Sequence, residues 1–192
     1  MDGGSAGVAG AFTCLTGDSP TDGMKKRRLF FALWPSEKQR QLIDSAIEPC
    51  KASLAGKWTS RDNLHVTLVF IGGFPEKDIP ALQAAAANIR SPAIRLRFER
   101  IDFWARPKIM CLQADFVPDQ LIELVRSLER AATGFGFQPE KRSYQPHMTI
   151  ARRARFFESI RLAQPVELHW SDFQLIESVS TPTGVQYKPL KQ

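Results

Sequence analysis

A four-residue pattern, His-x-Thr followed by an aliphatic residue, occurs twice in this chain and uses two of its three histidines. The first copy is His65–Leu68 and the second is His147–Ile150, 82 residues later. Both copies run into apolar segments, residues 64–71 and 148–151, which is typical of buried strands. Side chains alternate between the two faces of a strand. The pattern therefore predicts two strands that each present an imidazole and a hydroxyl on one face and bury the aliphatic side chains on the other.

Two imidazoles that face one cleft can act as a general acid and a general base, because an unperturbed histidine has a pKa of about 6.5. Threonine hydroxyls can donate to the oxygens of a bound oxyanion. A single His-x-Thr in a strand is more often structural. Two copies, each preceded by a polar or proline-containing approach, favour catalysis. We therefore take His65 and His147 as candidate catalytic residues, and Thr67 and Thr149 as candidate ligands of phosphate oxygens.

The two motifs and their flanks resemble the two-histidine phosphoesterases, and within them the bacterial RNA 2′,3′-cyclic phosphodiesterases, also called the 2′-5′ RNA ligase family. The resemblance covers about residues 27 to 190. It rests on four segments, which are Arg28–Leu33, Asn63–Gly72, Pro146–Arg152 and Tyr187–Leu190. It implies an α+β fold with two lobes, in which two antiparallel sheets flanked by helices enclose a central cleft carrying both motifs.

The resemblance also implies a reaction, the hydrolysis of a 2′,3′-cyclic phosphate end of RNA to a 2′-phosphate, without a metal or another cofactor. In this family His65 corresponds to the general acid toward the 3′-oxygen and His147 to the general base, whereas the residues alone leave open which is which. Phe30 corresponds to an aromatic residue near the nucleobase, and a core position is its alternative. Arg152, five residues beyond His147, is a candidate phosphate ligand, and a solvated strand end is its alternative.

Two other readings of the function stay open at this point. The same chemistry could act on another cyclic nucleotide or on a 2′-5′ linkage, including its reversible ligation, because the motifs recognise phosphate and say little about its attachments. A protein of a different class, an RNA-binding module without turnover, could keep the same fold. Intact histidines and threonines in both motifs argue against that module.

Composition limits the remaining possibilities. Of 192 residues 43% are hydrophobic, which suits one domain over residues 24–192 after a glycine-rich leader, residues 1–23. The net charge of +6 gathers in two basic clusters, residues 90–108 and 140–161. Such clusters fit a polyanionic partner such as RNA, with a solvated face as the alternative for either one, and the position of Arg152, Arg153 and Arg155 next to the second motif favours the partner. The three cysteines are scattered, no apolar run is long enough to span a bilayer, and no metal ligands cluster in the sequence. We therefore expect a cytoplasmic monomer without a bound metal and without membrane contact.

The coarse order of elements hints at an internal duplication. A strand over residues 28–34 precedes a helix that opens with a capping box at Ser36 and ends by Pro49, and a helix from Asp78 to Arg90 follows the first motif. A strand with a bulge near residues 99–100, a strand Ile109–Ala114 and a helix that ends at Gly134 precede the second motif. From Ser36 to His65 is 29 residues and from Asp119 to His147 is 28.

The segment His169–Ser171 imitates the motif but lacks its threonine, and we expect it to be structural.

Overall fold

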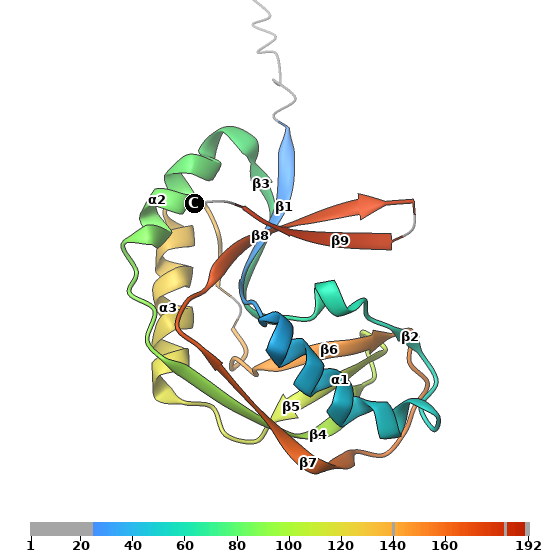
Figure 1. Cartoon of the computed structure of the whole chain (residues 1–192). Helices are drawn as coiled ribbons and strands as arrows, with labels where there is room; N and C mark the ends of the chain where they lie inside the picture. Colours follow the sequence, from blue (N-terminus) through green and yellow to red (C-terminus); the bar gives the residue numbers. More distant parts are fainter. Residues whose placement is uncertain (1–24, 140, 183, 191–192) are drawn as a thin grey trace, which may run out of the picture.

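A single antiparallel sheet forms the centre of the molecule (Figure 1). The computed structural model describes residues 25–139, 141–182 and 184–190, so the predicted leader lies outside the described residues. The strand order is β7-β4-β5-β6-β3-β1-β8-β9, and the short β2 pairs with β6. The strands are β1 (Lys26–Leu33), β2 (Lys57–Trp58), β3 (Val66–Pro75), β4 (Ile94–Trp104), β5 (Ile109–Ala114), β6 (His147–Arg152), β7 (Ile160–Trp170), β8 (Gln174–Thr181) and β9 (Gly184–Pro189).

The sheet consists of two halves of four strands that meet at the two motif strands. Strands β7, β4, β5 and β6 form one half, and β3, β1, β8 and β9 form the other. Val66 on β3 pairs with Met148 on β6 at the junction. The prediction of an α+β protein is confirmed, but the two expected sheets are hydrogen-bonded into one. The reason is that both motif strands have a free edge toward each other, and an unpaired edge is satisfied by the neighbouring strand.

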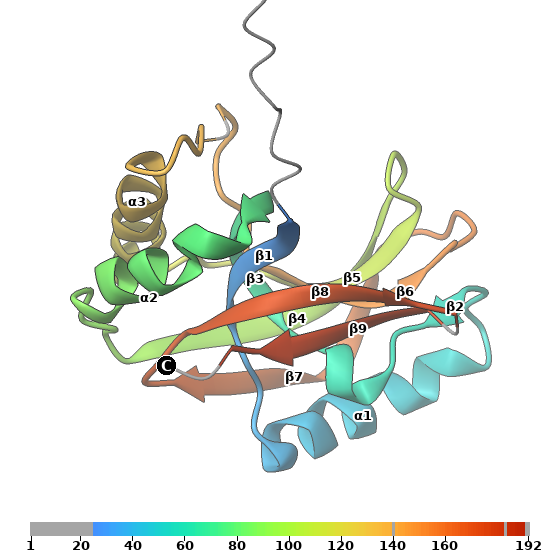
Figure 2. The same cartoon turned by 90° about the horizontal axis from the view of Figure 1, so that it is seen from above.

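Helices cover both halves of this sheet, and the buried side chains of α1, α2 and α3 share one hydrophobic core with Val66 and Met148 (Figure 2). Helix α1 (Glu37–Lys51) packs against β7, while α3 (Asp119–Thr133) packs against β3 and against α2 (Ile79–Ala87). Each half is therefore covered by a helix that follows a strand of the other half. Two short 3₁₀ helices, η1 (Arg61–Asn63) and η2 (Glu76–Asp78), precede β3 and α2.

Local sequence explains where the helices begin and end. Ser36 accepts from the amide of Gln39 and the Gln39 side chain accepts from the Ser36 amide, which is the predicted capping box. Helix α1 runs two residues past Pro49, because a proline in the last turn removes only one backbone donor. Asp78 makes no capping bond through its side chain, and α2 ends at Ala87, short of the expected Arg90. The predicted stop of α3 at Gly134 is confirmed.

Both motif strands carry a β-bulge directly after the motif threonine. On β3, Thr67 pairs with Ala32 and Val69 with Phe31, so Leu68 has no partner on β1. On β6, Thr149 pairs with Cys111 and Ala151 with Met110, so Ile150 has no partner on β5. A bulge inverts the alternation of side chains beyond it. The consequence is that Phe70 and Arg152 are exposed where regular strands would bury them.

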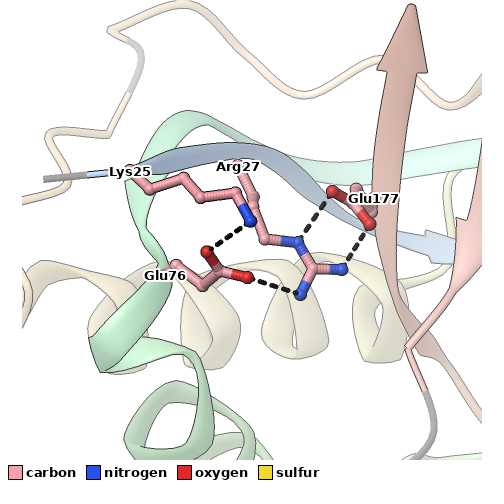
Figure 3. Close-up of polar contacts among 4 residues, drawn as sticks. All are labelled: Lys25, Arg27, Glu76 and Glu177. Carbon is pink, nitrogen blue, oxygen red and sulfur yellow. Dashed lines mark hydrogen bonds and ion pairs between the residues drawn. The ribbon is translucent and has the colours of Figure 1, made fainter.

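A cluster of ion pairs fixes the start of β1 (Figure 3). The Arg27 guanidinium makes a two-pronged contact with the Glu177 carboxylate on β8, and its other nitrogen lies 3.8 Å from Glu76 on η2. Lys25 also contacts Glu76, at 3.0 Å. The hydrogen bond from Arg27 keeps the pKa of Glu177 below its usual range. This cluster therefore ties the first strand to β8 and to the beginning of α2.

Candidate active site

The His65 ring is held by hydrogen bonds at both nitrogens. Its Nδ1 lies 2.7 Å from the carbonyl oxygen of Asn63, and its Nε2 lies 3.1 Å from the hydroxyl of Thr67. A carbonyl can only accept, so Nδ1 carries the proton of the neutral ring and Nε2 accepts from Thr67. His65 itself lies one residue before β3, which begins at Val66. The backbone two residues upstream thus fixes the tautomer.

His147 repeats this arrangement in the second motif. Its Nδ1 lies 2.9 Å from the carbonyl oxygen of Gln145, again two residues upstream. The same argument assigns the proton to Nδ1 and leaves Nε2 as the free base. Both motifs therefore present the same nitrogen, in the same protonation state, away from the backbone that holds the ring.

The register of the sheet brings the two motifs together on one face. Because Val66 pairs with Met148 in an antiparallel ladder, His65 lies opposite Thr149 and Thr67 lies opposite His147. Val66 and Met148 are fully buried, which confirms the predicted alternation around each motif. The four candidate side chains consequently form a compact group in which each imidazole faces a threonine of the other strand.

Aromatic rings surround both imidazoles. The Trp34 ring stacks on His65 with 5.9 Å between centroids, and Phe30 and Tyr187 contact His65 at 4.9 Å each. The Trp104 ring lies 4.2 Å from the His147 ring. Such contacts partly desolvate the two imidazoles and fix their orientation.

This environment lowers the pKa of both histidines. Burial is the largest cause in each case, because a desolvated imidazolium is disfavoured, and the hydrogen bond to the backbone carbonyl opposes the shift. The pKa of His65 falls to about 4, and the positive charges of Arg152 and His147 contribute to the decrease. The pKa of His147 is also lowered, with Arg142 and Arg152 contributing after burial. Both rings are therefore neutral in the empty site near pH 7.

An open cleft of about 460 Å³ adjoins this group. Thr67, His147 and Arg152 line it, and its walls also carry the positive charges of Arg28 and Arg142 and the negative charge of Glu129. The Arg152 guanidinium also reaches across to the other half of the sheet, where its Nη2 lies 3.4 Å from the hydroxyl of Tyr187. The cleft is thus electropositive and has hydrogen-bond donors on both walls.

The predicted site residues differ in how the structure places them. His65, His147, Thr67 and Thr149 form one group, and Arg152 lies at the cleft because of the bulge at Ile150. Phe30 is within the site but only 3% exposed, so its ring supports His65 and Tyr187 and offers little surface to a base. His169 lies on the outer strand β7, 3.0 Å from Glu167, away from the cleft.

Sequence reasoning did not find several residues of the site. Tyr144 is half-buried, and its hydroxyl donates to the carbonyl oxygen of Thr67 at 2.9 Å, so the approach to the second motif is anchored on the first. Asn63 accepts from the amide of Tyr187 and donates to the carbonyl of Val185, which fixes β9 beside His65. Trp104 carried no motif that could have marked it.

Among the residues that the structure describes, no three His, Cys, Asp or Glu side chains gather as metal ligands would. None of the helices in that part of the chain is both long and apolar enough to cross a bilayer.

Comparisons with known proteins identify the family of this chain and agree with its fold. A family model for the 2′-5′ RNA ligase superfamily matches residues 35–179. The RNA 2′,3′-cyclic phosphodiesterase of Escherichia coli K12 is 31% identical over 171 residues, which are 86% of this chain and 95% of the relative. The Thermotoga maritima protein of the same name is 27% identical over 176 residues, 85% and 92% of the two chains.

Solved structures give the same result. The crystal structure of E. coli LigT in apo form matches with a TM-score of 0.78 at 28% identity, covering 87% of this chain and 96% of that one. The complex of LigT with 3′-AMP also has a TM-score of 0.78, at 29% identity, and covers 86% and 96%. The chain belongs to the 2′-5′ RNA ligase superfamily.

Proposed function

We propose that this protein hydrolyses the 2′,3′-cyclic phosphate end of RNA to a 2′-phosphate end. Relatives that align over most of this chain bear the name RNA 2′,3′-cyclic phosphodiesterase. The observation that carries the proposal is the matched pair of imidazoles. Each donates Nδ1–H to a carbonyl two residues upstream, Nε2 of His65 accepts from Thr67, and His147 lines an electropositive cleft. An acid and a base on either side of a phosphate are what an in-line displacement at phosphorus requires.

In this mechanism Nε2 of His147 takes a proton from water as the water oxygen attacks phosphorus. The bond between phosphorus and the 3′-oxygen breaks, and His65 gives a proton from Nε2 to that oxygen, which leaves a free 3′-hydroxyl and a 2′-phosphate. Thr67, Thr149 and Arg152 donate to the nonbridging oxygens, where negative charge builds in the transition state. Each proton transfer contributes about 10²–10⁴-fold to the rate.

The protonation states fit these roles once substrate is bound. In the empty site the pKa of His65 is about 4, so its Nε2 carries no proton near pH 7. His65 gains a proton when the anionic phosphate binds, because a negative charge nearby favours the imidazolium. His147 is neutral near pH 7 and accepts a proton directly. Phe30 and Trp34 keep the His65 ring in place.

We further propose that residues 24–192 act as one catalytic unit built from two duplicated halves. The correspondence between β1-α1-β3 and β5-α3-β6 supports this, since each motif strand follows a helix and lies at the junction of the sheet. The matching bulges after Thr67 and Thr149 support it as well.

The decisive experiment uses a short RNA with a 2′,3′-cyclic phosphate end, incubated with the protein and with the double variant His65→Ala/His147→Ala. We expect only the wild type to open the cyclic phosphate. The product should carry a phosphate monoester on the 2′-oxygen, which a phosphatase can then remove. A 3′-phosphate product would contradict the assigned leaving group. Binding without any product would favour the RNA-binding module, and joining to an added 5′-hydroxyl RNA would favour the 2′-5′ ligase.

A further inference from the structure

Two turns meet at the end of the sheet next to the active site. One joins β4 to β5 and the other joins β6 to β7, and Figure 2 shows them side by side. The amide of Ala154 donates to the carbonyl of Lys108 at 2.9 Å, which links them directly. Lys108 and Arg153 have φ angles of 50° and 51°, and within the described residues they are the only non-glycine residues with positive φ. A left-handed conformation is unfavourable for such residues, and it is commonly retained at functional sites.

The four basic residues at these turns have no acidic partners. Arg106, Lys108, Arg153 and Arg155 are exposed, and none has a carboxylate within ion-pair distance in the described part of the chain. Basic residues farther along β4 are paired instead, Arg95 with Glu167 and Arg97 with Glu99. The turns therefore combine unneutralised charge from both of the basic clusters seen in the sequence.

An aromatic ring stands among these charges. Phe156 is 78% exposed, and its ring meets Phe103 edge-on with 5.8 Å between centroids. Its neighbour Phe157 is half-buried against the same Phe103 and packs on the core. One face of the Phe156 ring is thus available at a fixed position, as in the stacking platforms of proteins that bind single-stranded nucleic acid.

The active-site cleft leads to this surface. Trp104, Pro107 and Arg152 all line the cleft, and Pro107 lies between Arg106 and Lys108 in the chain. Arg152 contacts Tyr187 in the site, and the next residue, Arg153, belongs to the second turn. A strand held by its end at His147 would therefore pass the two turns as it leaves the cleft.

We propose that Arg106, Lys108, Arg153, Arg155 and Phe156, here called the tip surface, bind the single-stranded RNA that precedes the cyclic phosphate end. The cations contact backbone phosphates, and the Phe156 ring stacks on one base. The inference rests on the proposed function and adds a substrate class to it. The preferred substrate is an oligonucleotide, and a nucleoside 2′,3′-cyclic phosphate binds only in the cleft.

The test compares two substrates, a ten-nucleotide RNA with a 2′,3′-cyclic phosphate end and adenosine 2′,3′-cyclic phosphate. Phe156→Ala should raise the KM for the oligonucleotide at least fivefold, given the usual contribution of base stacking. Arg106→Glu/Arg155→Glu should raise it further and reduce the slope of log KM against log salt. Neither change should alter kcat/KM for the mononucleotide more than twofold.

Matched controls lie at the opposite end of the sheet. Arg90 is exposed and precedes β4, whereas Arg106 follows it, and the strand of 11 residues separates them by about 33 Å. Phe116 is 75% exposed and follows β5 at that same end. Arg90→Glu and Phe116→Ala should leave the KM of both substrates unchanged.

Each outcome decides a different point. If the wild type hydrolyses both substrates and the tip variants behave like the wild type on the oligonucleotide, the RNA path is wrong and the proposed function stands. If the tip variants lose activity equally on the mononucleotide, the surface attracts anions in general and does not bind a strand. If the wild type hydrolyses neither substrate, the proposed function itself fails.

Discussion

Val66 and Met148 are paired across the middle of the sheet, and within the described chain this pair sets the register between β3 and β6. Both side chains are fully buried, so a shift by one residue would expose them and turn the motif side chains into the core. The pair therefore fixes the placement of His65 opposite Thr149 and of Thr67 opposite His147. A packing contact between two apolar residues on one face of the sheet thus positions the histidine and threonine side chains of both motifs on the other face.

Replacing either histidine by alanine should remove nearly all hydrolysis of a cyclic-phosphate RNA. The expected loss is about 10²–10⁴-fold in kcat for His65→Ala and for His147→Ala, because each removes one proton transfer. Binding, measured with a noncleavable RNA, should change little since Arg28, Arg142 and Arg152 remain. A variant that keeps more than a tenth of the wild-type kcat would disprove the pairing of acid and base.

The hydroxyls of Thr67 and Thr149 should matter more for turnover than for binding. Thr67→Val and Thr149→Val keep the shape of the side chain and lose the donor, so kcat should fall about tenfold or more while KM changes less. Thr→Ser at either position should be milder because the donor survives. Steady-state kinetics on the cyclic-phosphate RNA check this. Wild-type kcat in both valine variants would mark the threonines as packing residues and leave Arg152 as the main donor.

Tyr187 links the two halves of the site and should contribute through its hydroxyl. That oxygen accepts from Arg152 at 3.4 Å, while the ring contacts His65. Tyr187→Phe removes the oxygen and keeps the ring, so we expect a modest loss of about three- to tenfold in kcat/KM with an unchanged melting temperature. Tyr187→Leu is the matched comparison, since it also removes the ring contact with His65. Equal activity of the phenylalanine variant and the wild type would show that Arg152 needs no help from Tyr187.

The sequence predicted the parts of this site that depend on local pattern. Alternation within each motif, the capping box at Ser36 and the bulge in β4 all follow from a few neighbouring residues. The bulge at Ile150 was not predictable, because Ile150 and Ala151 are both apolar and read as a regular buried strand. The joining of the two halves into one sheet was also missed, since it depends on contacts between residues 82 positions apart.

The long-range partners of the imidazoles escaped prediction for the same reason. Trp104 and Tyr187 reach His147 and His65 only through the strand order, and an isolated aromatic residue in a sequence is indistinguishable from a core residue. Phe30 was identified through the family resemblance, and its burial shows a supporting position beside His65.

Stability should decrease as the pH falls, and His65 should account for part of the decrease. In the unfolded chain His65 has a pKa of about 6.5, whereas in the folded protein it is about 4. Between these values the unfolded state binds more protons, so the free energy of unfolding falls as the pH is lowered from 7 to 4. The melting temperature measured across this range should fall less steeply in His65→Gln than in the wild type. Parallel curves for the two proteins would contradict the lowered pKa.

Hydrolysis should not depend on a divalent metal. In the proposed mechanism His147 and His65 move the two protons, and Thr67, Thr149 and Arg152 compensate the charge on the phosphate, so no step requires a Lewis acid. We expect the rate on the ten-nucleotide RNA to be the same before and after dialysis against EDTA. The control is the same protein with Mg²⁺, Mn²⁺ or Zn²⁺ added back, at constant ionic strength, because salt alone weakens binding to a polyanion. A rate that disappears with EDTA and returns with one of these ions would replace the two-histidine mechanism by one in which a metal activates the water.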